Sequence, residues 1–428
     1  MSNVKLGYSS GIITPDLGIH LAGYATDSRR STGVHDDLHT RVICLEKDEE
    51  DFLIIQNEMI GVDYAFSDRV KDTVKKYGIS PLNVFVGVTH THSGPKGIIQ
   101  NETGEKTDLM KLMGLYNDDM CAKMIDVIEE NVRKALENKS PCSIRYGFTK
   151  IEGVGLNRNN KDLPFDDNLL AMEFLREDGK RVLLYNMSCH PTVMRAENTL
   201  YSADWPCGVT KLAEGIDYDM VMFINGSAGD VSTRFTRQSS TFDELERVGG
   251  IVYAAVKKAL NSAKSEEITE LKAFAFTHKM ALRNFGSTEE AQEKFDNYMK
   301  ALNAARDRGE AALRPYESKV EGAAVNLVMS QITSGGKDLD MRLQVLRLND
   351  FVFVFAPSEL FSALTLPVRN ELGLKMVFCT YFNGNHGYIT DMGAFDNETY
   401  EAMSSRFERG EGEGLIARIR EEVLKVLG

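Results

Sequence analysis

The sequence lacks the features of disulfide-rich, membrane-spanning and nucleic-acid-binding proteins. Its six cysteines are scattered and include no Cys-x-x-Cys pair, which argues against a disulfide framework and favours reduced thiols. No apolar stretch reaches the roughly 18–20 residues of a membrane helix, and residues 1–15 contain no apolar signal-peptide core. The net charge of −13 argues against binding to nucleic acid or to anionic lipid. We therefore expect a soluble, cytoplasmic protein with no nucleic-acid partner and no stable membrane insertion.

Several familiar functional motifs are missing as well. The chain contains no Walker loop, no His-Glu-x-x-His helix and no Gly-x-Gly-x-x-Gly turn, and no nucleophile elbow is expected. Candidate chemistry must therefore come from smaller groups of residues at the ends of the expected strands.

Strand-like and helix-like patterns alternate along the chain, in an ordinary globular composition of 43% hydrophobic and 26% charged residues. Such alternation predicts an α/β fold with mixed β-sheets flanked by helices. No internal repeat or low-complexity linker is visible, so we expect a single domain over residues 1–428. Strand-like runs cover residues 41–45, 52–56, 84–88, 143–149, 169–175, 181–187 and 220–225, and helical spacing covers residues 64–77, 109–136 and 241–260.

Residues 287–320 break this pattern because they are charged and rich in alanine. The spacing predicts a solvated helix or helical hairpin that is inserted into the domain and stands out from its body. A surface insertion is the simpler interpretation. The alternative is that the insertion walls one side of a substrate cleft.

The most informative segment is the apolar run at residues 84–88, which is followed by His90 and His92. In extended backbone, positions i and i+2 point to the same side, so both imidazoles would face one cleft. The ends of strands are where α/β proteins usually build their sites. With only eight histidines in the chain, this pair indicates the start of a metal site.

A second histidine, His190, follows the apolar run at residues 181–187 in a similar way. Zinc sites take imidazole ligands from separate elements, and a carboxylate is a common further ligand. Glu58 and Glu359 both follow strand-like runs, and their spacing does not choose between them.

Two more turns at strand ends are rich in functional residue types. Residues 225–232 form a Gly/Asn/Ser/Asp loop, whose backbone N–H groups could hold an oxyanion and whose Ser232 could be a nucleophile. Residues 383–389 place Tyr388 after another apolar run.

These segments, in this order, resemble the neutral/alkaline (non-lysosomal) ceramidase family. Residues 88–95 match its ATHTHSGP-like segment, residues 188–192 its histidine loop, and residues 229–234 its GDVSPN-like loop. Residues 383–388 are similar to its NGYxGY-like segment, and Tyr400-Glu401 to the pair that follows it. Residues 21–25 and 32–36 are similar to its opening segments, so the resemblance spans nearly the whole chain.

The resemblance implies one catalytic zinc ion per chain, held by His90, His190, Glu359 and Tyr388. It also implies a working shell of His92, Arg158, Ser232 and Tyr400. In that shell zinc would polarise an amide carbonyl and activate water or the Ser232 hydroxyl. His92 would carry protons, and Tyr400 would donate to the developing oxyanion.

The sequence also departs from the family pattern. Thr233 and Arg234 stand where the family has proline and asparagine, and the NRSP-like run is Asn157-Arg158-Asn159-Asn160. Family members are usually longer and carry a C-terminal immunoglobulin-like domain, whereas only the catalytic domain is expected here.

The resulting functional hypothesis is a zinc-dependent hydrolase of a linear amide bond, with a place in lipid or sphingolipid metabolism. Its substrate would be ceramide or, more in keeping with the departures, a smaller N-acyl amine. An esterase or an amino-sugar deacetylase on the same zinc site is one alternative. A non-catalytic metal-binding protein is the other. Oligomeric state is not indicated by the sequence.

Overall fold

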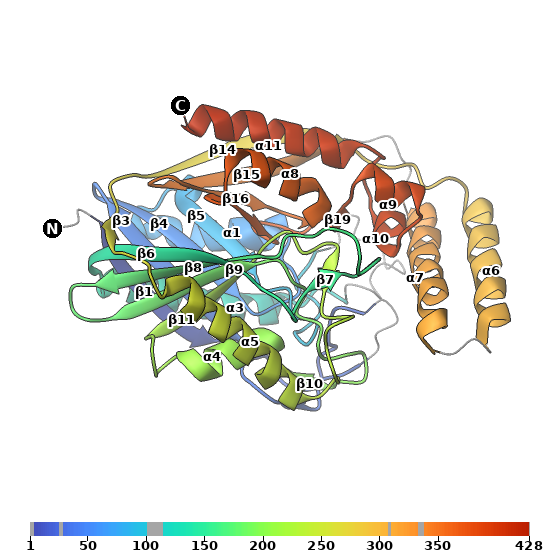
Figure 1. Cartoon of the computed structure of the whole chain (residues 1–428), viewed down its shortest axis with the longest axis horizontal. Helices are drawn as coiled ribbons and strands as arrows, with labels where there is room; N and C mark the ends of the chain where they lie inside the picture. The colour runs from blue at the N-terminus through green and yellow to red at the C-terminus, as the bar shows by residue number, and fades with distance from the viewer. Residues whose placement is uncertain (1–3, 25–28, 101–113, 307–309, 333–337, 428) are drawn as a thin grey trace.

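Two β-sheets packed face to face, with helices on their outer sides, form the body of the protein (Figure 1). The computed structural model describes residues 4–24, 29–100, 114–306, 310–332 and 338–427. One hydrophobic core lies between the sheets, and three further cores lie between a sheet and its helices. The expected α/β fold class is therefore confirmed.

The larger sheet has nine strands, in the order β11-β9-β8-β6-β1-β3-β4-β5, with β13 pairing to β6. Neighbouring strands are antiparallel except at the two ends, where β4 pairs with β5 and β9 with β11 in parallel. The strands are β1 (Lys5–Ile12), β3 (His39–Lys47), β4 (Glu50–Asn57), β5 (Val84–Val88), β6 (Ser140–Lys150), β8 (Asn168–Arg176), β9 (Arg181–Met187), β11 (Met220–Asn225) and β13 (Glu266–Glu267).

The smaller sheet has the order β14-β15-β16-β18 and covers one face of the larger sheet. Both faces of β3 and β16 are buried, which explains why these segments read as continuous apolar runs rather than alternating ones. The strands of the smaller sheet are β14 (Leu271–Ala281), β15 (Asp338–Leu348), β16 (Phe351–Ala356) and β18 (Met376–Thr380). Short pairs elsewhere are β2 (Gly33–Val34) with β10 (Leu200–Tyr201), β7 (Leu156–Asn157) with β12 (Val231–Ser232), and β17 (Glu359–Leu360) with β19 (Tyr388–Ile389).

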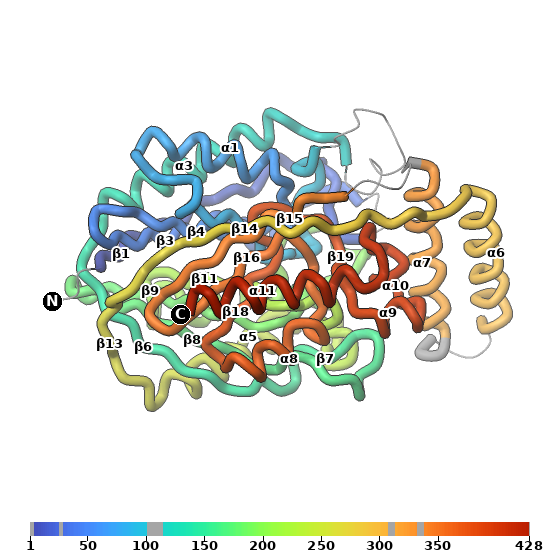
Figure 2. The backbone as a smooth tube through the Cα atoms, turned by 90° about the horizontal axis from the view of Figure 1, so that it is seen from above, coloured from blue at the N-terminus to red at the C-terminus, as the bar shows by residue number. Residues whose placement is uncertain are grey.

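The helices cover the outer faces of the sheets. Seen from above, α11 crosses over β16 and β18 (Figure 2). No helix of the described ranges is both long and apolar enough to cross a bilayer. The helices of the body are α1 (Tyr64–Val74), α3 (Asp118–Glu137), α4 (Trp205–Ala213), α5 (Phe242–Leu260), α8 (Ser362–Leu372), α9 (Met392–Asp396), α10 (Tyr400–Ser404) and α11 (Glu411–Leu427), with 3₁₀ turns at Lys75–Tyr77 and Pro81–Asn83.

The helix expected over residues 109–136 begins later than its periodicity indicates. Residues 114–117 are not helical, and residues 109–113 lie outside the described residues. The side chain of Asn117 accepts a hydrogen bond from the Met120 N–H, at 3.1 Å, and so caps α3 at Asp118.

One order of elements occurs three times among the described residues, although the sequence shows no repeat. Three strands pair antiparallel, a helix follows, a fourth strand pairs parallel to the third, and a last helix closes the unit. The units are β1-β3-β4-α1-β5-α3, β6-β8-β9-α4-β11-α5 and β14-β15-β16-α8-β18-α11. The first two share the large sheet and the third forms the small one. We call these units one, two and three.

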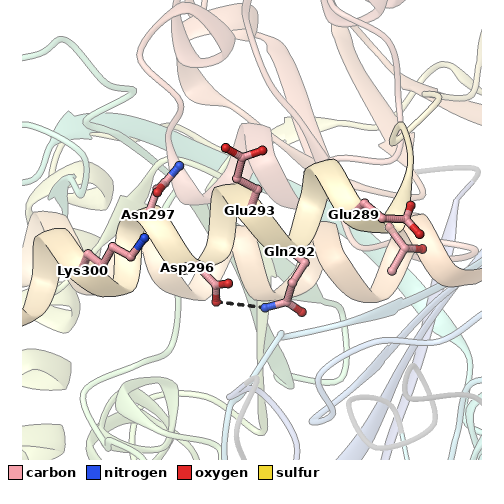
Figure 3. A pocket seen from close by; sticks show the side chains of 7 residues that line it. Glu289, Gln292, Glu293, Asp296, Asn297 and Lys300 are labelled. Atoms are coloured by element: carbon pink, nitrogen blue, oxygen red, sulfur yellow. Dashed lines mark hydrogen bonds between the residues drawn. The ribbon is translucent and has the colours of Figure 1, made fainter.

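A helical hairpin interrupts unit three between β14 and β15 and projects from the body, at the right of Figure 1. It consists of α6 (Thr288–Ala305) and α7 (Glu310–Ile332). Ser287 and Glu290 form a capping box that starts α6. The outer helix α6 presents a polar, mostly exposed face that includes Glu289, Glu293 and Asp296 (Figure 3). This face explains the charged composition of the segment.

Candidate metal centre and active site

The ends of strands from all three units meet at one buried group of residues. His90 follows β5 of unit one, His190 follows β9 of unit two, and Glu359 follows β16 of unit three. These residues are 3%, 0% and 7% exposed. In the parallel pair β17–β19, Glu359 is in register with Tyr388, which brings the fourth expected ligand to the same group. An isolated β-bridge joins His190 to Ser232.

Both histidines at the strand ends are held through Nδ1. The Nδ1 atom of His90 lies 2.6 Å from the carbonyl oxygen of Ile60, and that of His190 lies 2.6 Å from the carbonyl oxygen of Ala228. A carbonyl oxygen only accepts hydrogen bonds, so each Nδ1 carries the proton. In a neutral ring, Nε2 then presents a lone pair. Histidines that bind metals are oriented in this way by backbone carbonyl groups.

The two Nε2 atoms face the same carboxylate oxygen. Glu359 Oε2 lies 3.2 Å from His90 Nε2 and 3.3 Å from His190 Nε2. Burial, with the positive charge of Arg158, lowers the pKa of His190 to about 4, so this ring is neutral near pH 7. Burial alone would raise the pKa of Glu359, but the adjacent His90 and His190 hold it well below its usual value.

This arrangement of donor atoms fits a metal ion. A lone pair on Nε2 and a carboxylate oxygen repel each other at such distances unless a cation lies between them. Tetrahedral zinc, with bonds of about 2.0–2.1 Å, separates its ligand atoms by about 3.3–3.4 Å. The separations between Glu359 Oε2 and the two Nε2 atoms are close to that value.

His92 completes a group of three buried imidazoles whose ligand atoms lie within 4.8 Å of one another. Neither ring nitrogen of His92 has a hydrogen-bond partner among the described residues. Burial, together with the neighbouring His90 and His190, lowers its pKa well below the usual value. The ring packs edge-on against Tyr24, with 5.2 Å between ring centroids, and Gly23 allows the backbone to approach it closely. The His92 ring is therefore uncharged at neutral pH, and both of its nitrogens are without a partner among the described residues.

Arg158, Tyr388 and Tyr400 lie together beside this group. The guanidinium of Arg158 sits over the Tyr388 ring at 5.2 Å from its centroid, and the Tyr388 and Tyr400 rings are 5.9 Å apart. Burial raises the pKa of Tyr388 well above its usual value and that of Tyr400 to about 12. Tyr400 is thus a hydroxyl donor, and Tyr388 would need a bound cation to become a phenolate ligand.

Ser232 is 5% exposed and lies on β12, in register with Leu156 of β7. This pairing places it beside Arg158, which follows β7. Its loop is anchored by Asp230, which accepts hydrogen bonds from the Ser362 N–H at 2.6 Å and the Ser362 hydroxyl at 3.0 Å. Burial raises the pKa of Asp230 to about 6 despite these bonds. The expected working shell thus lies around the histidine group.

Of the two carboxylates that the sequence left open, the structure places Glu359 with the histidines. Glu58 is occupied elsewhere, because it forms an ion pair with Arg41 and accepts the His39 N–H at 2.7 Å. Residues 7–11 fit the letters Gly-x-Ser-x-Gly, but they lie inside β1, and the Ser9 hydroxyl donates to Asn131 at 2.5 Å. They form no nucleophile elbow.

Sequence reasoning did not find Tyr381, which stacks on His90 with 4.1 Å between ring centroids. Its buried hydroxyl has no hydrogen-bond partner among the described residues. Positive φ angles of 70° at His90, 63° at Tyr381 and 62° at Asn383 gather around this group. Such backbone strain is concentrated at functional sites. It leaves no signature in the amino-acid letters.

Comparisons with known proteins support the resemblance. The profile of the family described as neutral/alkaline non-lysosomal ceramidase, N-terminal, matches residues 5–216, which include all three clustered histidines. Neutral ceramidase 3 of Arabidopsis thaliana is 28% identical over 163 residues, or 37% of this chain and 22% of that protein. Neutral ceramidase of Mycobacterium tuberculosis is 23% identical over 208 residues, which are 43% of this chain and 31% of that protein. These alignments span less than a third of each relative's length.

Two solved structures share the fold over almost the whole chain. Neutral ceramidase from Pseudomonas aeruginosa superposes with a TM-score of 0.77 and 17% identity, covering 99% of this chain and 75% of that one. A structure described as ceramidase complexed with C2 superposes with a TM-score of 0.76 and 16% identity, covering 100% of this chain and 76% of that chain. Glu359, Tyr388 and Tyr400 lie beyond the profile match but within this shared fold.

Proposed function

Because the chain belongs to the neutral/alkaline non-lysosomal ceramidase family, we propose that it is a zinc-dependent hydrolase of linear amide bonds. The observation that carries the proposal is the geometry of His90, His190 and Glu359. Two ring nitrogens, each fixed as a lone-pair donor through Nδ1, face one carboxylate oxygen at 3.2 and 3.3 Å. This donor set suits one zinc ion, with Tyr388 as the fourth ligand. Zinc bound there would polarise the amide carbonyl and favour deprotonation of the nucleophile.

The other residues divide the remaining chemistry between them. Ser232 either attacks the carbonyl carbon or orients a water molecule that attacks it. His92, held neutral by burial, takes the proton from this nucleophile and returns it to the departing amine nitrogen. Overall, the C–N bond breaks, the oxygen of water stays on the acyl carbon, and the amine leaves with the protons.

Two further groups stabilise the charge that develops on the carbonyl oxygen. Tyr400 keeps its proton near neutral pH because burial raises its pKa to about 12, so its hydroxyl can donate to the oxyanion. Arg158 holds its positive charge through Glu401, which outweighs the effect of burial and keeps its pKa well above the usual value. Its Nη2 has no partner among the described residues and remains available to the substrate.

The hairpin forms part of the same proposal, as one wall of the substrate cleft. Helix α7 packs against α10, which carries Tyr400, so closely that a Cβ atom on Gly322 would lie 2.6 Å from Met403. Lys294 of α6 pairs with Glu398 at 2.7 Å, just before α10. These contacts join both helices of the hairpin to the segment that carries Tyr400.

The test is metal analysis combined with hydrolysis of a panel of N-acyl amines, including ceramide, before and after chelation. About one zinc ion per chain and chelator-sensitive amide cleavage are expected. Ser232→Ala should keep the zinc and lose at least about 100-fold in kcat. Ser239→Ala, in an exposed part of the following loop, is the matched control and should keep both the zinc and the kcat of the parent. Full turnover by Ser232→Ala would remove the serine from the mechanism, and a metal-free active enzyme would refute the zinc assignment.

A further inference from the structure

Two arginines follow Ser232 in the chain, Arg234 and Arg237, and have no acidic partner among the described residues. Both are half-buried. The protein has 63 acidic residues against 50 basic ones, so available carboxylates are not scarce. These two half-buried guanidinium groups nevertheless keep N–H groups that no carboxylate of the described residues occupies. Such an arrangement is expected where an anionic ligand supplies the missing charge.

The turn that carries both arginines is fixed in place. The N–H groups of Thr236 and Arg237 donate to the carbonyl oxygen of Thr233, at 3.1 and 2.9 Å, which winds the turn like a helix. The Thr236 hydroxyl also donates to the carbonyl oxygen of Val154 and ties the turn to the body.

Arg234 is held close to the reacting groups. Its backbone N–H donates to the Ser232 hydroxyl oxygen at 3.3 Å, and its Nη1 donates to the carbonyl oxygen of Arg158 at 2.8 Å. Arg237 donates through Nη1 to the carbonyl oxygen of Thr192, two residues after His190. Both side chains thus use one Nη1 on a neutral acceptor and keep further N–H groups for a ligand.

Neighbouring carboxylates act on this pair without forming an ion pair among the described residues: Asp204 acts on Arg237, and Glu401 acts on Arg234. Arg314 of α7 acts on both arginines, but it is itself paired with Glu321 at 2.8 Å. Glu401 is taken by Arg158 at 2.6 Å. Burial, followed by the positive charges of Arg314 and Arg158, lowers the pKa of Arg234 to about 10. The group remains charged at neutral pH and lies in a field of like charge that an anion would relieve.

We propose that Arg234 binds a carboxylate of the substrate, which makes the substrate an N-acylated amino acid. The inference rests on the proposed amide hydrolysis and names its substrate class. The Arg234 backbone N–H donates to Ser232 and its Nη1 to the carbonyl oxygen of Arg158, so we expect an anion bound there to lie close to the scissile amide. The α-carboxylate of an N-acyl amino acid is two bonds from the amide nitrogen. A guanidinium binds a carboxylate through two parallel hydrogen bonds. The polar head of ceramide is uncharged and offers no such group.

Hydrolysis of this substrate needs only water. The bond between the acyl carbon and the amide nitrogen breaks, the acyl group leaves as a fatty acid, and the amino acid leaves with its carboxylate unchanged.

The test compares N-octanoylglycine with N-octanoylglycinamide, which differ only in the carboxylate, using the zinc-loaded full chain. We expect kcat/KM to be at least tenfold higher for N-octanoylglycine, mainly through KM. Arg234→Gln should lower kcat/KM at least tenfold for the acid and less than threefold for the amide. Arg420→Gln, a change of the same kind on α11, should leave both unchanged. Equal loss on both compounds, or no preference in the parent, would overturn the inference while leaving amide hydrolysis intact.

A binding measurement separates the substrate class from the reaction. In zinc-loaded Ser232→Ala, calorimetric titration should show N-octanoylglycine binding at least tenfold more tightly than the glycinamide. Arg234→Gln in that background should remove the difference. Equal affinities would overturn the carboxylate assignment even if no turnover is found. Selective binding without turnover in the parent enzyme would instead count against the proposed hydrolysis.

Discussion

Arg158 and Glu401 form a buried ion pair, with 2.6 Å between Nε and Oε1. Their side chains are 9% and 2% exposed. The pair joins the segment after β7, beside Ser232, to α10, which carries Tyr400. It therefore fixes the distance between two sides of the proposed active site.

Glu401→Gln should destabilise the protein by about 3–5 kcal/mol, because it leaves the charge of Arg158 buried without a partner. Urea unfolding of the metal-loaded protein measures the change. Glu421→Gln on α11, which removes a carboxylate 3.5 Å from Arg418 at the surface, should cost less than about 1 kcal/mol. If Glu401→Gln loses no more stability than Glu421→Gln, water or a neighbouring group must compensate the charge of Arg158.

His190→Ala should abolish stoichiometric zinc binding, because it removes one of the two fixed Nε2 donors. Mass spectrometry of the metal content checks this, with His278→Ala on β14 as the control that keeps the metal. The folded variant should also lose the increase in melting temperature that zinc gives the parent. Tight zinc retained in a His90→Ala/His190→Ala double variant would show that the site lies elsewhere.

Gly23→Ala should lower kcat at least tenfold without loss of zinc. Its added Cβ would lie 2.4 Å from the His92 ring, which we assign to proton transfer and not to the metal. Gly18→Ala is the matched control, because Gly18 has a φ of +90° but nothing within 4 Å of an added Cβ, whereas Gly23 has +109°. Both variants thus place an alanine at a positive φ, but only Gly23→Ala brings a Cβ atom against the His92 ring. Equal effects on kcat would contradict the assignment of His92.

Asp204 should make the folded protein less stable as the pH rises from about 4 to about 6, whereas His190, whose pKa is lowered to about 4, acts in the opposite direction. Burial raises the pKa of the Asp204 carboxyl from 3.8 to about 6, although three backbone N–H groups lower it. In that window the folded protein keeps a proton that the unfolded chain has lost, so rising pH favours unfolding. The full shift corresponds to about 3 kcal/mol.

Asp204→Asn should lose less stability than the parent between pH 4.5 and 6.5, as measured by urea unfolding. Because the amide accepts fewer backbone hydrogen bonds than the carboxylate, the variant is less stable than the parent at both pH 4.5 and pH 6.5. The readout is therefore how much the stability of each protein changes between these two pH values. Asp243→Asn, at the exposed start of α5, should follow the parent. Identical pH profiles for Asp204→Asn and the parent would mean that Asp204 ionises normally in the fold.

The strand-end histidines could be located from the sequence because a local rule applies to them. His90 and His190 each follow an apolar run directly, and the end of a strand is a place where side chains from different strands converge. The sequence does not show whether Glu58 or Glu359 is the carboxylate ligand, since both follow such runs. The distinction depends on Arg41, which forms an ion pair with Glu58 from a neighbouring strand. Only the pairing of β3 with β4 shows this contact.

Other features of the site have no local signal at all. The stacking of Tyr381 on His90 arises where unit three docks on unit one. The contact of α7 with α10 follows from where the hairpin leaves the sheet, which amphipathic spacing does not encode. The threefold recurrence of elements is hidden because each unit fills its strands with different apolar side chains.

The convergence of three units on one group of ligands links metal binding to the folding of the entire chain. His90, His190 and Glu359 are separated by 100 and 169 residues, so no local segment contains the site. Each unit can contribute its ligand only after it has docked on the other two. A metal ion would therefore act as a clamp across the whole assembly, and zinc at 100 times its Kd would add about 2.7 kcal/mol to global stability. Zinc release on heating should consequently coincide with cooperative unfolding rather than precede it.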